Sequence, residues 1–199
     1  MSRKVRLTTP ISAKEALALR VGDEVLISGV VITARDRAHR FLAEEANPRT
    51  LPFYLGGAII YHCGPLVKRE GEKYRVISAG PTTSARMNIY APKVLDKFGV
   101  RGFIGKGGMN ETVGRALKKY GAVYLAATGG AAVLLGKCIT KVLGNFKLKE
   151  FGLPECFWIL EVKDLPAIVA MDAHGGDLFR KVRERCAKVR NILLASTRV

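Results

Sequence analysis

The stretch around Gly80-Pro81 places the strongest constraint on how this chain can fold. A largely apolar run, Tyr74–Ala79, precedes it. Glycine permits a sharp turn and proline fixes φ, so we expect a strand to end here. Apolar residues then recur at helical spacing over Met87–Phe98, which predicts a helix that begins at Thr82 or Thr83. A strand that turns directly into a helix is typical of α/β proteins.

The same alternation recurs along the chain. Ser12-x-x-Glu15 is a capping-box pattern, Asp36 can cap a second helix, and Asn110 can cap a third that ends at Gly121. Pro166 separates the last two apolar runs, so we expect two strands there. The runs predicted as further strands are Lys4–Thr9, Glu24–Thr33, Ala58–Cys63, Ala122–Thr128, Phe157–Val162 and Ala167–Met171. Val100–Gly108 is predicted to be a strand that ends in a glycine-rich loop.

Segments without such patterns separate these elements. Asn47–Gly57 holds two prolines and two glycines and is predicted to be a long surface loop. Lys68–Lys73 is predicted to be a polar turn and Lys147–Pro154 to be irregular. From Asp177 onward apolar residues recur at spacings of four and seven between Arg and Lys. The sequence therefore predicts an α/β domain over residues 1–176 and a basic amphipathic helical tail over 177–199.

Cations stand near three predicted strand ends. A helix that begins at the two threonines would offer free N–H groups and the positive end of its dipole to an anion, with Arg86 one turn further on. The alternative is an ordinary N-cap. Lys106 lies among glycines, although no Ser or Thr follows as in a Walker loop. Arg35 follows another strand, where ligands of α/β sheets gather, and its alternative is a solvated surface arginine.

Composition narrows the classes of protein that are compatible with this chain. The net charge of +16 is compatible with nucleic acid, an acidic protein partner or a small dianion. The four cysteines are isolated and form no metal-ligand spacing with the three histidines. No apolar leader follows the first residues and no apolar run approaches membrane-spanning length. We therefore expect a cytoplasmic protein without a membrane span and without a metal or cofactor bound by this chain alone.

Two motifs are similar to a known family. Gly80–Met87 and Ile104–Gly108 resemble the beta subunit, or C-terminal domain, of the class I iron–sulfur-dependent fumarate hydratase and L-tartrate dehydratase family. Matches continue in order at Thr33–His39 and Ile60–Pro65 and run from about residue 6 to residue 178. The resemblance implies a swivelling β/β/α domain with a central sheet flanked by helices.

The resemblance also implies a partner and a reaction. An alpha subunit would hold a [4Fe-4S] cluster through its own cysteines, and the two chains would share one active site as a heterotetramer, or this subunit alone would form a homodimer. The implied reaction is the hydration of fumarate to (S)-malate in the tricarboxylic acid cycle, by a hydro-lyase whose isolated beta subunit is inactive. L(+)-tartrate dehydration to oxaloacetate is the alternative, and nucleic-acid binding is a distant one.

Carried over to this chain, the resemblance assigns roles to six residues. Thr82 matches the base that acts on the substrate C3 proton. The residues implied to bind the dicarboxylate substrate are Arg35, Thr83, Arg86, Lys106 and Gly107. Fixed cations suit a dicarboxylate because charge-assisted hydrogen bonds are strong and directional.

Overall fold

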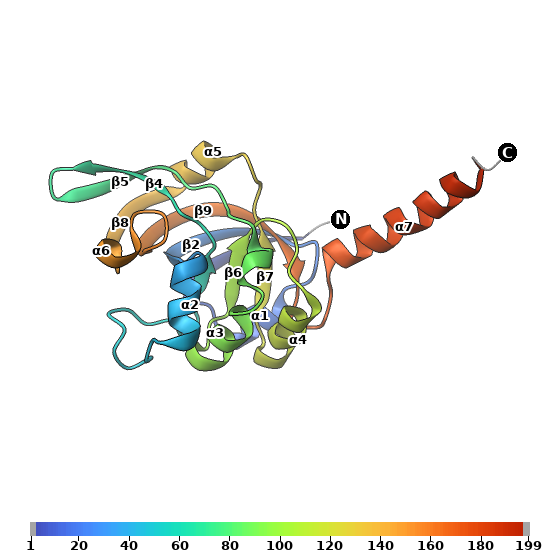
Figure 1. Ribbon diagram of the computed structural model, residues 1–199, viewed down its shortest axis with the longest axis horizontal. Helices are drawn as coiled ribbons and strands as arrows, with labels where there is room; N and C mark the ends of the chain where they lie inside the picture. The colour runs from blue at the N-terminus through green and yellow to red at the C-terminus, as the bar shows by residue number, and fades with distance from the viewer. Residues whose placement is uncertain (1–2, 197–199) are drawn as a thin grey trace.

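Parallel strands and a long antiparallel strand build the main sheet of this computed structural model, which describes residues 3–196 (Figure 1). Its order is β1-β2-β3-β6-β7-β9-β8, and β4 and β5 form a separate hairpin. The strands are β1 Lys4–Thr9, β2 Glu24–Thr33, β3 Ile59–Tyr61, β4 Leu66–Glu70, β5 Lys73–Ser78, β6 Gly102–Gly105, β7 Val123–Ala126, β8 Ile139–Phe146 and β9 Phe157–Met171.

Caps that can be read from the sequence set several helix ends. The Ser12 side chain accepts from the Glu15 N–H and Glu15 reciprocates, which completes the predicted capping box. Asn110 accepts from the Val113 N–H at 3.0 Å, and Gly121 ends the same helix at φ 61°. The helices are α1 Ala13–Ala18, α2 Asp36–Glu44, the 3-10 helix η1 Ser84–Met87, α3 Ala91–Phe98, α4 Glu111–Tyr120, α5 Ala132–Lys137, α6 Leu148–Phe151 and α7 Leu178–Ser196.

The main sheet closes on itself. β2, β3, β6 and β7 pair in parallel. β9 pairs antiparallel with β2 along most of its length and with β8 and β7 at its two ends. The pairing therefore runs in a circuit through β2, β3, β6, β7 and β9. In a parallel set the carboxyl ends of the strands share one edge, and this edge carries the candidate site.

Alternating side chains divide the core into two clusters, because successive residues of a strand face opposite sides. Ile60 and Phe103 face the layer of α2, α3 and α4, whereas Ile59 and Ile104 face the inside of the circuit. Figure 1 shows the three helices together on one face of the strands. The predicted α/β class, with a central sheet flanked by helices and a C-terminal helix, is confirmed.

Several local predictions are wrong. Phe157–Val162 and Ala167–Met171 belong to one strand, because β2 pairs across the break and Pro166 stands in register with Leu26. The predicted polar turn Lys68–Lys73 contributes to both strands of the β4–β5 hairpin. Sequence reasoning placed no strand at β8 and no helix at α6, and Asp36 is the first residue of α2 rather than its cap.

The C-terminal helix departs from the rest of the chain. α7 projects beyond the domain (Figure 1), and Phe179 in its first turn packs against the core. Within residues 3–196, no helix is long and apolar enough to cross a membrane. The predicted boundary between residues 176 and 177 falls just before α7 and stays a prediction.

Candidate functional site

The candidate site lies at the carboxyl edge of the parallel strands. Arg35 follows β2, His62 follows β3 and Lys106 follows β6. Gly129 follows β7, and a Cβ at this position would lie 3.2 Å from Cδ of Lys106. The topology therefore gathers side chains that are far apart in sequence at one edge of the sheet, where open α/β sheets bind their ligands.

Backbone pairing joins the Thr82–Ser84 segment to the loop of Lys106. The Thr82 N–H donates to the His62 carbonyl at 2.7 Å, and the Lys106 N–H donates to the Thr82 carbonyl at 3.1 Å. The Ser84 N–H donates to the Lys106 carbonyl at 3.0 Å, and Thr83 and Lys106 form a parallel bridge.

This pairing corrects the prediction of a helix that begins at Thr82 or Thr83. Both threonines precede η1, with Thr83 extended at φ −65° and ψ 113°, and the next α-helix begins at Ala91. The N–H groups of Thr82 and Ser84 already donate to carbonyls, so they do not offer an anion the free donors of a helix start. An anion at this position would therefore have to be bound by side chains.

Arg86 and Arg35 share one carboxylate, that of Asp36, and Arg86 also contacts Thr82. Arg86 Nη2 donates to Asp36 Oδ2 at 2.9 Å and to Thr82 Oγ1 at 3.0 Å. Arg35 Nη2 lies 3.2 Å from Glu155 Oε1 and 3.9 Å from Asp36 Oδ2. The carboxylates hold both guanidinium groups in place, and the positive charge of Arg86 favours an anionic form of the Thr82 oxygen.

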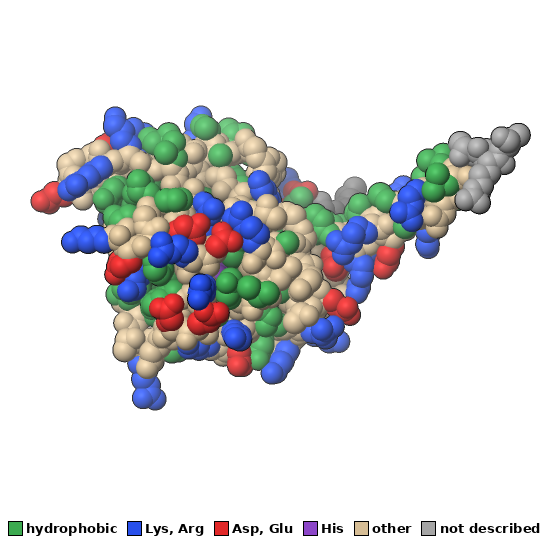
Figure 2. Space-filling view, in the orientation of Figure 1, with side chains coloured by type: hydrophobic (Ala, Val, Ile, Leu, Met, Phe, Trp, Pro, Cys, Tyr) green, Lys and Arg blue, Asp and Glu red, His purple; other side chains and the backbone are tan. Residues whose placement is uncertain are grey.

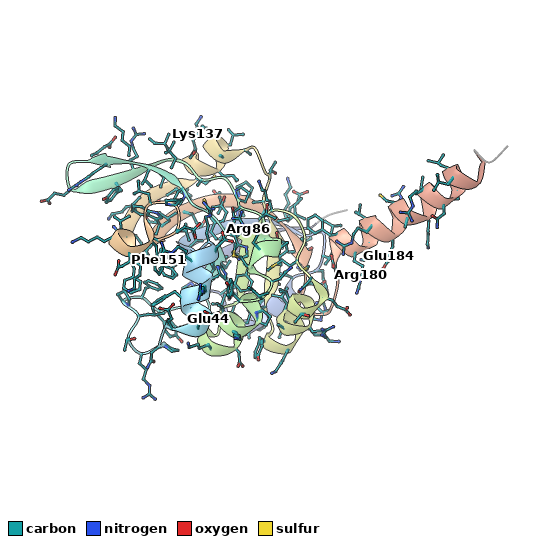
Figure 3. All side chains as sticks on the ribbon, viewed as in Figure 1. Glu44, Arg86, Lys137, Phe151, Arg180 and Glu184 are labelled. Carbon is teal, nitrogen blue, oxygen red and sulfur yellow. The ribbon has the colours of Figure 1, made fainter. Side chains whose placement is uncertain are left out.

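The site is open to solvent. The Arg86 side chain is 45% exposed, Thr82 is half-buried and Lys106 is exposed. Across residues 3–196, Lys106 takes part in no side-chain hydrogen bond or ion pair within the chain. Figure 3 places Arg86 near the centre of the face where Figure 2 shows acidic and basic side chains side by side. Two cavities, of about 370 and 700 Å³, are lined by other residues. The cations are therefore accessible to an approaching ligand or protein surface.

A buried polar network supports the two site loops from below. Ser84 Oγ lies 2.9 Å from His62 Nδ1 and 3.0 Å from the Tyr124 hydroxyl. Tyr124 also donates to the Gly107 carbonyl at 2.7 Å. A Cβ at Gly105 would collide with Ser84 Oγ, so this position needs glycine. The network ties the Thr82 segment to the Lys106–Gly107 loop without using the exposed groups.

Burial keeps the histidines beneath the site neutral. Desolvation lowers the pKa of His39 to about 4 and that of His62 well below its usual range. The two rings stack edge to face with centroids 4.8 Å apart. Desolvation also raises the pKa of Tyr124 to about 12. None of these groups changes charge near neutral pH, which fits a positioning role.

The described residues contain no group of three or more His, Cys, Asp and Glu side chains that could hold a metal ion. The cysteines are free, and burial raises the pKa of the Cys63 and Cys156 thiols to about 12. A cluster ligand must be a thiolate. Among the described residues, the cysteines are therefore not gathered into a set of cluster ligands.

All six sequence-predicted site residues lie at this edge. Arg35, Thr82 and Arg86 are connected through side chains, and Lys106 and Thr83 through the backbone bridge. The Gly107 carbonyl accepts from Tyr124, and Tyr124 contacts Ser84 in the Thr82 segment. Sequence reasoning assigned no site role to His62, Ser84 and Tyr124 or to the carboxylates Asp36 and Glu155. Asp36 was visible only as a helix-start residue.

Together the fold and this geometry define an α/β domain that presents fixed cations and a threonine hydroxyl at the carboxyl edge of its sheet, a class suited to binding anions. More particularly, the chain belongs to the family described as Fumarase C-terminus, whose family model matches residues 1–182. The resemblance of Gly80–Met87 and Ile104–Gly108 to this family is thereby confirmed.

Three relatives show how the match extends. A provisionally named class I fumarate hydratase of Geobacillus stearothermophilus is 44% identical over 183 residues, which are 92% of this chain and 35% of that protein. A provisionally named L(+)-tartrate dehydratase subunit beta of Methanocaldococcus jannaschii is 40% identical and covers 92% of this chain and 95% of the relative. The L(+)-tartrate dehydratase subunit beta of Escherichia coli K12 is 36% identical, with 93% and 91% covered. This chain thus spans about a third of the first relative and nearly all of the other two.

Proposed function

We propose that this chain is the beta component of a class I fumarate hydratase, a hydro-lyase that interconverts fumarate and (S)-malate. The observation that carries the proposal is the contact of Arg86 with Thr82, linked to Arg35 through Asp36 at the carboxyl edge of the sheet. It places a hydroxyl oxygen beside the guanidinium group of Arg86, and a positive charge in this position supports the removal of a proton next to a carboxylate. The 44% identity to a relative named fumarate hydratase supports the choice of substrate.

The cations of this edge bind the two carboxylates of the substrate in the proposal. Arg86 and Arg35 are held by Asp36 and Glu155 before substrate arrives, so a substrate carboxylate competes with these carboxylates for the guanidinium groups. Arg35 Nε is buried without a hydrogen-bond partner among the described residues, which leaves this guanidinium incompletely satisfied. Lys106 supplies a cation that no carboxylate of the described chain engages. The exposed Thr83 and Gly107 line the approach.

Thr82 is the proposed base. In the dehydration of malate its oxygen, as an alkoxide, takes the C3 proton, the C3–H electron pair forms the C2–C3 double bond, and hydroxide leaves C2. Hydration runs these steps in reverse. A threonine hydroxyl is a weak base at its ordinary pKa. Arg86 at 3.0 Å stabilises the alkoxide. The described residues place no carboxylate in hydrogen-bond contact with Thr82, so the group that accepts the hydroxyl proton is expected from the partner chain.

A partner subunit completes the site in this account. We propose that an alpha subunit holds the [4Fe-4S] cluster, which supplies a Lewis acid for the substrate hydroxyl and carboxylate. The exposure of Arg86 and Lys106 supports a site that is half of an assembly. This chain contributes carboxylate binding and proton removal and is inactive by itself.

A second candidate is the beta subunit of an L(+)-tartrate dehydratase, which would act on tartrate to give oxaloacetate. One observation favours it: this chain covers 95% and 91% of two relatives with that name, but 35% of the fumarate hydratase. Steady-state assays of the reconstituted pair with each substrate decide between them. Rapid tartrate dehydration without fumarate hydration would replace the first candidate with the second.

The roles of Thr82 and Arg86 are tested by kinetics of the reconstituted pair. Thr82→Ala should lower kcat by about 10²–10⁴-fold with a smaller change in KM, because a proton-transfer group acts in the transition state. Arg86→Ala should lower kcat and raise KM, because it removes a charge-assisted contact to the substrate as well. Arg40→Ala is the control, since Arg40 pairs with Glu44 on the exposed face of α2. Equal and slight effects of the first two substitutions would refute both roles.

A further inference from the structure

The helix α7 leaves the domain beside the candidate site. Phe179 in its first turn packs on Gly108, where an added Cβ would lie 3.2 Å from the Phe179 ring. Gly108 directly follows Gly107 of the site. Beyond this turn the helix extends away from the sheet (Figure 1), and Figure 3 places Arg180 and Glu184 on its first half. The family match ends at residue 182, so most of α7 lies beyond the part that the family model covers.

An apolar seam runs along this projecting helix. Val182, Cys186, Val189 and Leu193 follow one another at spacings of four, three and four, which places them on one face. Val182 is 52% exposed and Val189 is 49% exposed, and Ile192 beside them is 68% exposed. A large exposed apolar stripe on a charged helix marks an interaction surface.

Positive charge borders the seam. α7 carries six basic side chains and one carboxylate, Glu184. On a helical projection Arg183 and Arg190 flank the seam on one side and Arg185 on the other. Within residues 3–196, Arg180 is the α7 cation that takes part in an ion pair, with Glu184 at 4.0 Å. Figure 2 shows basic and apolar side chains alternating along the helix.

The apolar seam and its positively charged borders together limit which kind of molecule can bind α7. Pairing with α7 of a second copy would place like charges along both borders of the seam. A nucleic acid would neutralise the cations but would leave Val182, Val189 and Ile192 in water. A protein surface with an apolar groove bordered by carboxylates satisfies both features, because it buries the seam and pairs the arginines.

We propose that α7 is a docking arm for the partner subunit that completes the active site, and that it binds an acidic, apolar groove on that subunit. The inference rests on the proposed function. Any chain that completes the site must approach Lys106 and Gly107, and the first turn of α7 packs on the adjacent Gly108. The arm therefore extends the contact between the two chains past the region that the family shares.

The test measures the dissociation constant between this chain and its cognate iron–sulfur alpha subunit by titration calorimetry. The doubly substituted full-length chain Val182→Ser, Val189→Ser should bind at least about 10-fold more weakly, because it loses two apolar anchors of the seam. Its kcat at saturating alpha subunit should be unchanged, since neither residue touches the site. Affinity of the parent chain should fall as salt rises. The control Ala187→Ser, Asn191→Ser alters the opposite face and should bind like the parent.

A chain truncated after Lys181, which keeps Phe179, provides a second variant and should bind as weakly as the double substitution. Equal affinity of all variants for the alpha subunit would overturn the inference and leave the proposed function standing. The double substitution could instead abolish self-association, binding to duplex DNA or binding to phosphatidylserine vesicles while the affinity for the alpha subunit stays unchanged. This result would assign the seam to another occupant and would also overturn the inference. If the intact chain forms no complex with the alpha subunit, the proposed function itself is refuted.

Discussion

Replacement of Ser84 by alanine removes one buried oxygen atom and tests whether the Ser84 hydroxyl positions the site or only fills space in the core. Ser84 Oγ is the junction between His62 Nδ1 at 2.9 Å and the Tyr124 hydroxyl at 3.0 Å, and Ser84 is fully buried. Ser84→Ala deletes both contacts and leaves the space of one oxygen atom. Tyr124 keeps its hydrogen bond to the Gly107 carbonyl, but His62 Nδ1 loses its one side-chain partner in the described chain.

The expected loss of stability follows from these contacts. A buried polar atom left without a partner costs about 1–3 kcal/mol, and the lost hydrogen bond to Tyr124 contributes about 1 kcal/mol more. We therefore expect the free energy of unfolding to fall by about 3 kcal/mol, which corresponds to about 6–12 °C in Tm for a chain of this size. Thermal and urea unfolding of the purified variant measure this change.

Activity is the second readout of Ser84→Ala. Below the lowered Tm, the reconstituted variant should lose about 10–100-fold in kcat, because the Thr82 segment is no longer tied to the Lys106 loop and small misplacements are costly. Ser28→Ala is the control: Ser28 lies in the middle of β2, and its Oγ accepts from the Asp164 N–H at 3.0 Å. Unchanged kcat in Ser84→Ala, or the same loss in Ser28→Ala, would refute the positioning role.

Two further predictions concern the buried layer beneath the site. The pKa of His39 is about 4 in the folded chain against an ordinary 6.5, so the unfolded chain binds the proton first as pH falls. The free energy of unfolding therefore falls by about 3 kcal/mol between pH 6.5 and pH 4. His39→Gln should reduce this pH dependence in unfolding measurements between pH 7 and 4, and an unchanged slope would contradict the prediction. Gly105→Ala should destabilise the fold by about 1–3 kcal/mol and abolish turnover by the reconstituted pair. Gly144→Ala is the control, because the nearest neighbour of an added Cβ there lies at 3.9 Å, and it should change stability and activity only slightly. Similar effects of the two substitutions would contradict the close approach of Ser84 to Gly105.

Local signals in the sequence predicted those parts of the fold that depend on neighbouring residues. The capping box of Ser12 and Glu15 and the Asn110 cap of α4 involve groups three residues apart, so the sequence alone defines them. Pro166 illustrates the opposite case. A proline locally indicates a strand break, but pairing with β2 on one side and with β7 and β8 at the two ends holds β9 together through it.

The sequence predicted the cations and threonines of the candidate site but not the buried side chains beneath them. Arg86 and Lys106 stand beside glycines and threonines in patterns typical of anion sites, so sequence reasoning reached them. Ser84 meets His62 and Tyr124 across 22 and 40 residues of sequence, and no periodicity links the three. The backbone pairing that holds Thr83 in an extended conformation beside Lys106 is also long-range. The sequence alone does not show this pairing, so the predicted helix start at Thr82 or Thr83 was wrong.

Fumarate hydration tests most directly whether this chain holds half of a dicarboxylate site. Three samples are compared: this chain alone, the iron–sulfur alpha subunit alone, and the reconstituted pair. Consumption of fumarate followed by its ultraviolet absorbance should be negligible for each chain alone and rapid for the pair. Replacement of this chain by its Thr82→Ala variant should remove that activity. Turnover by the isolated chain, or full activity of the pair with Thr82→Ala, would contradict the account.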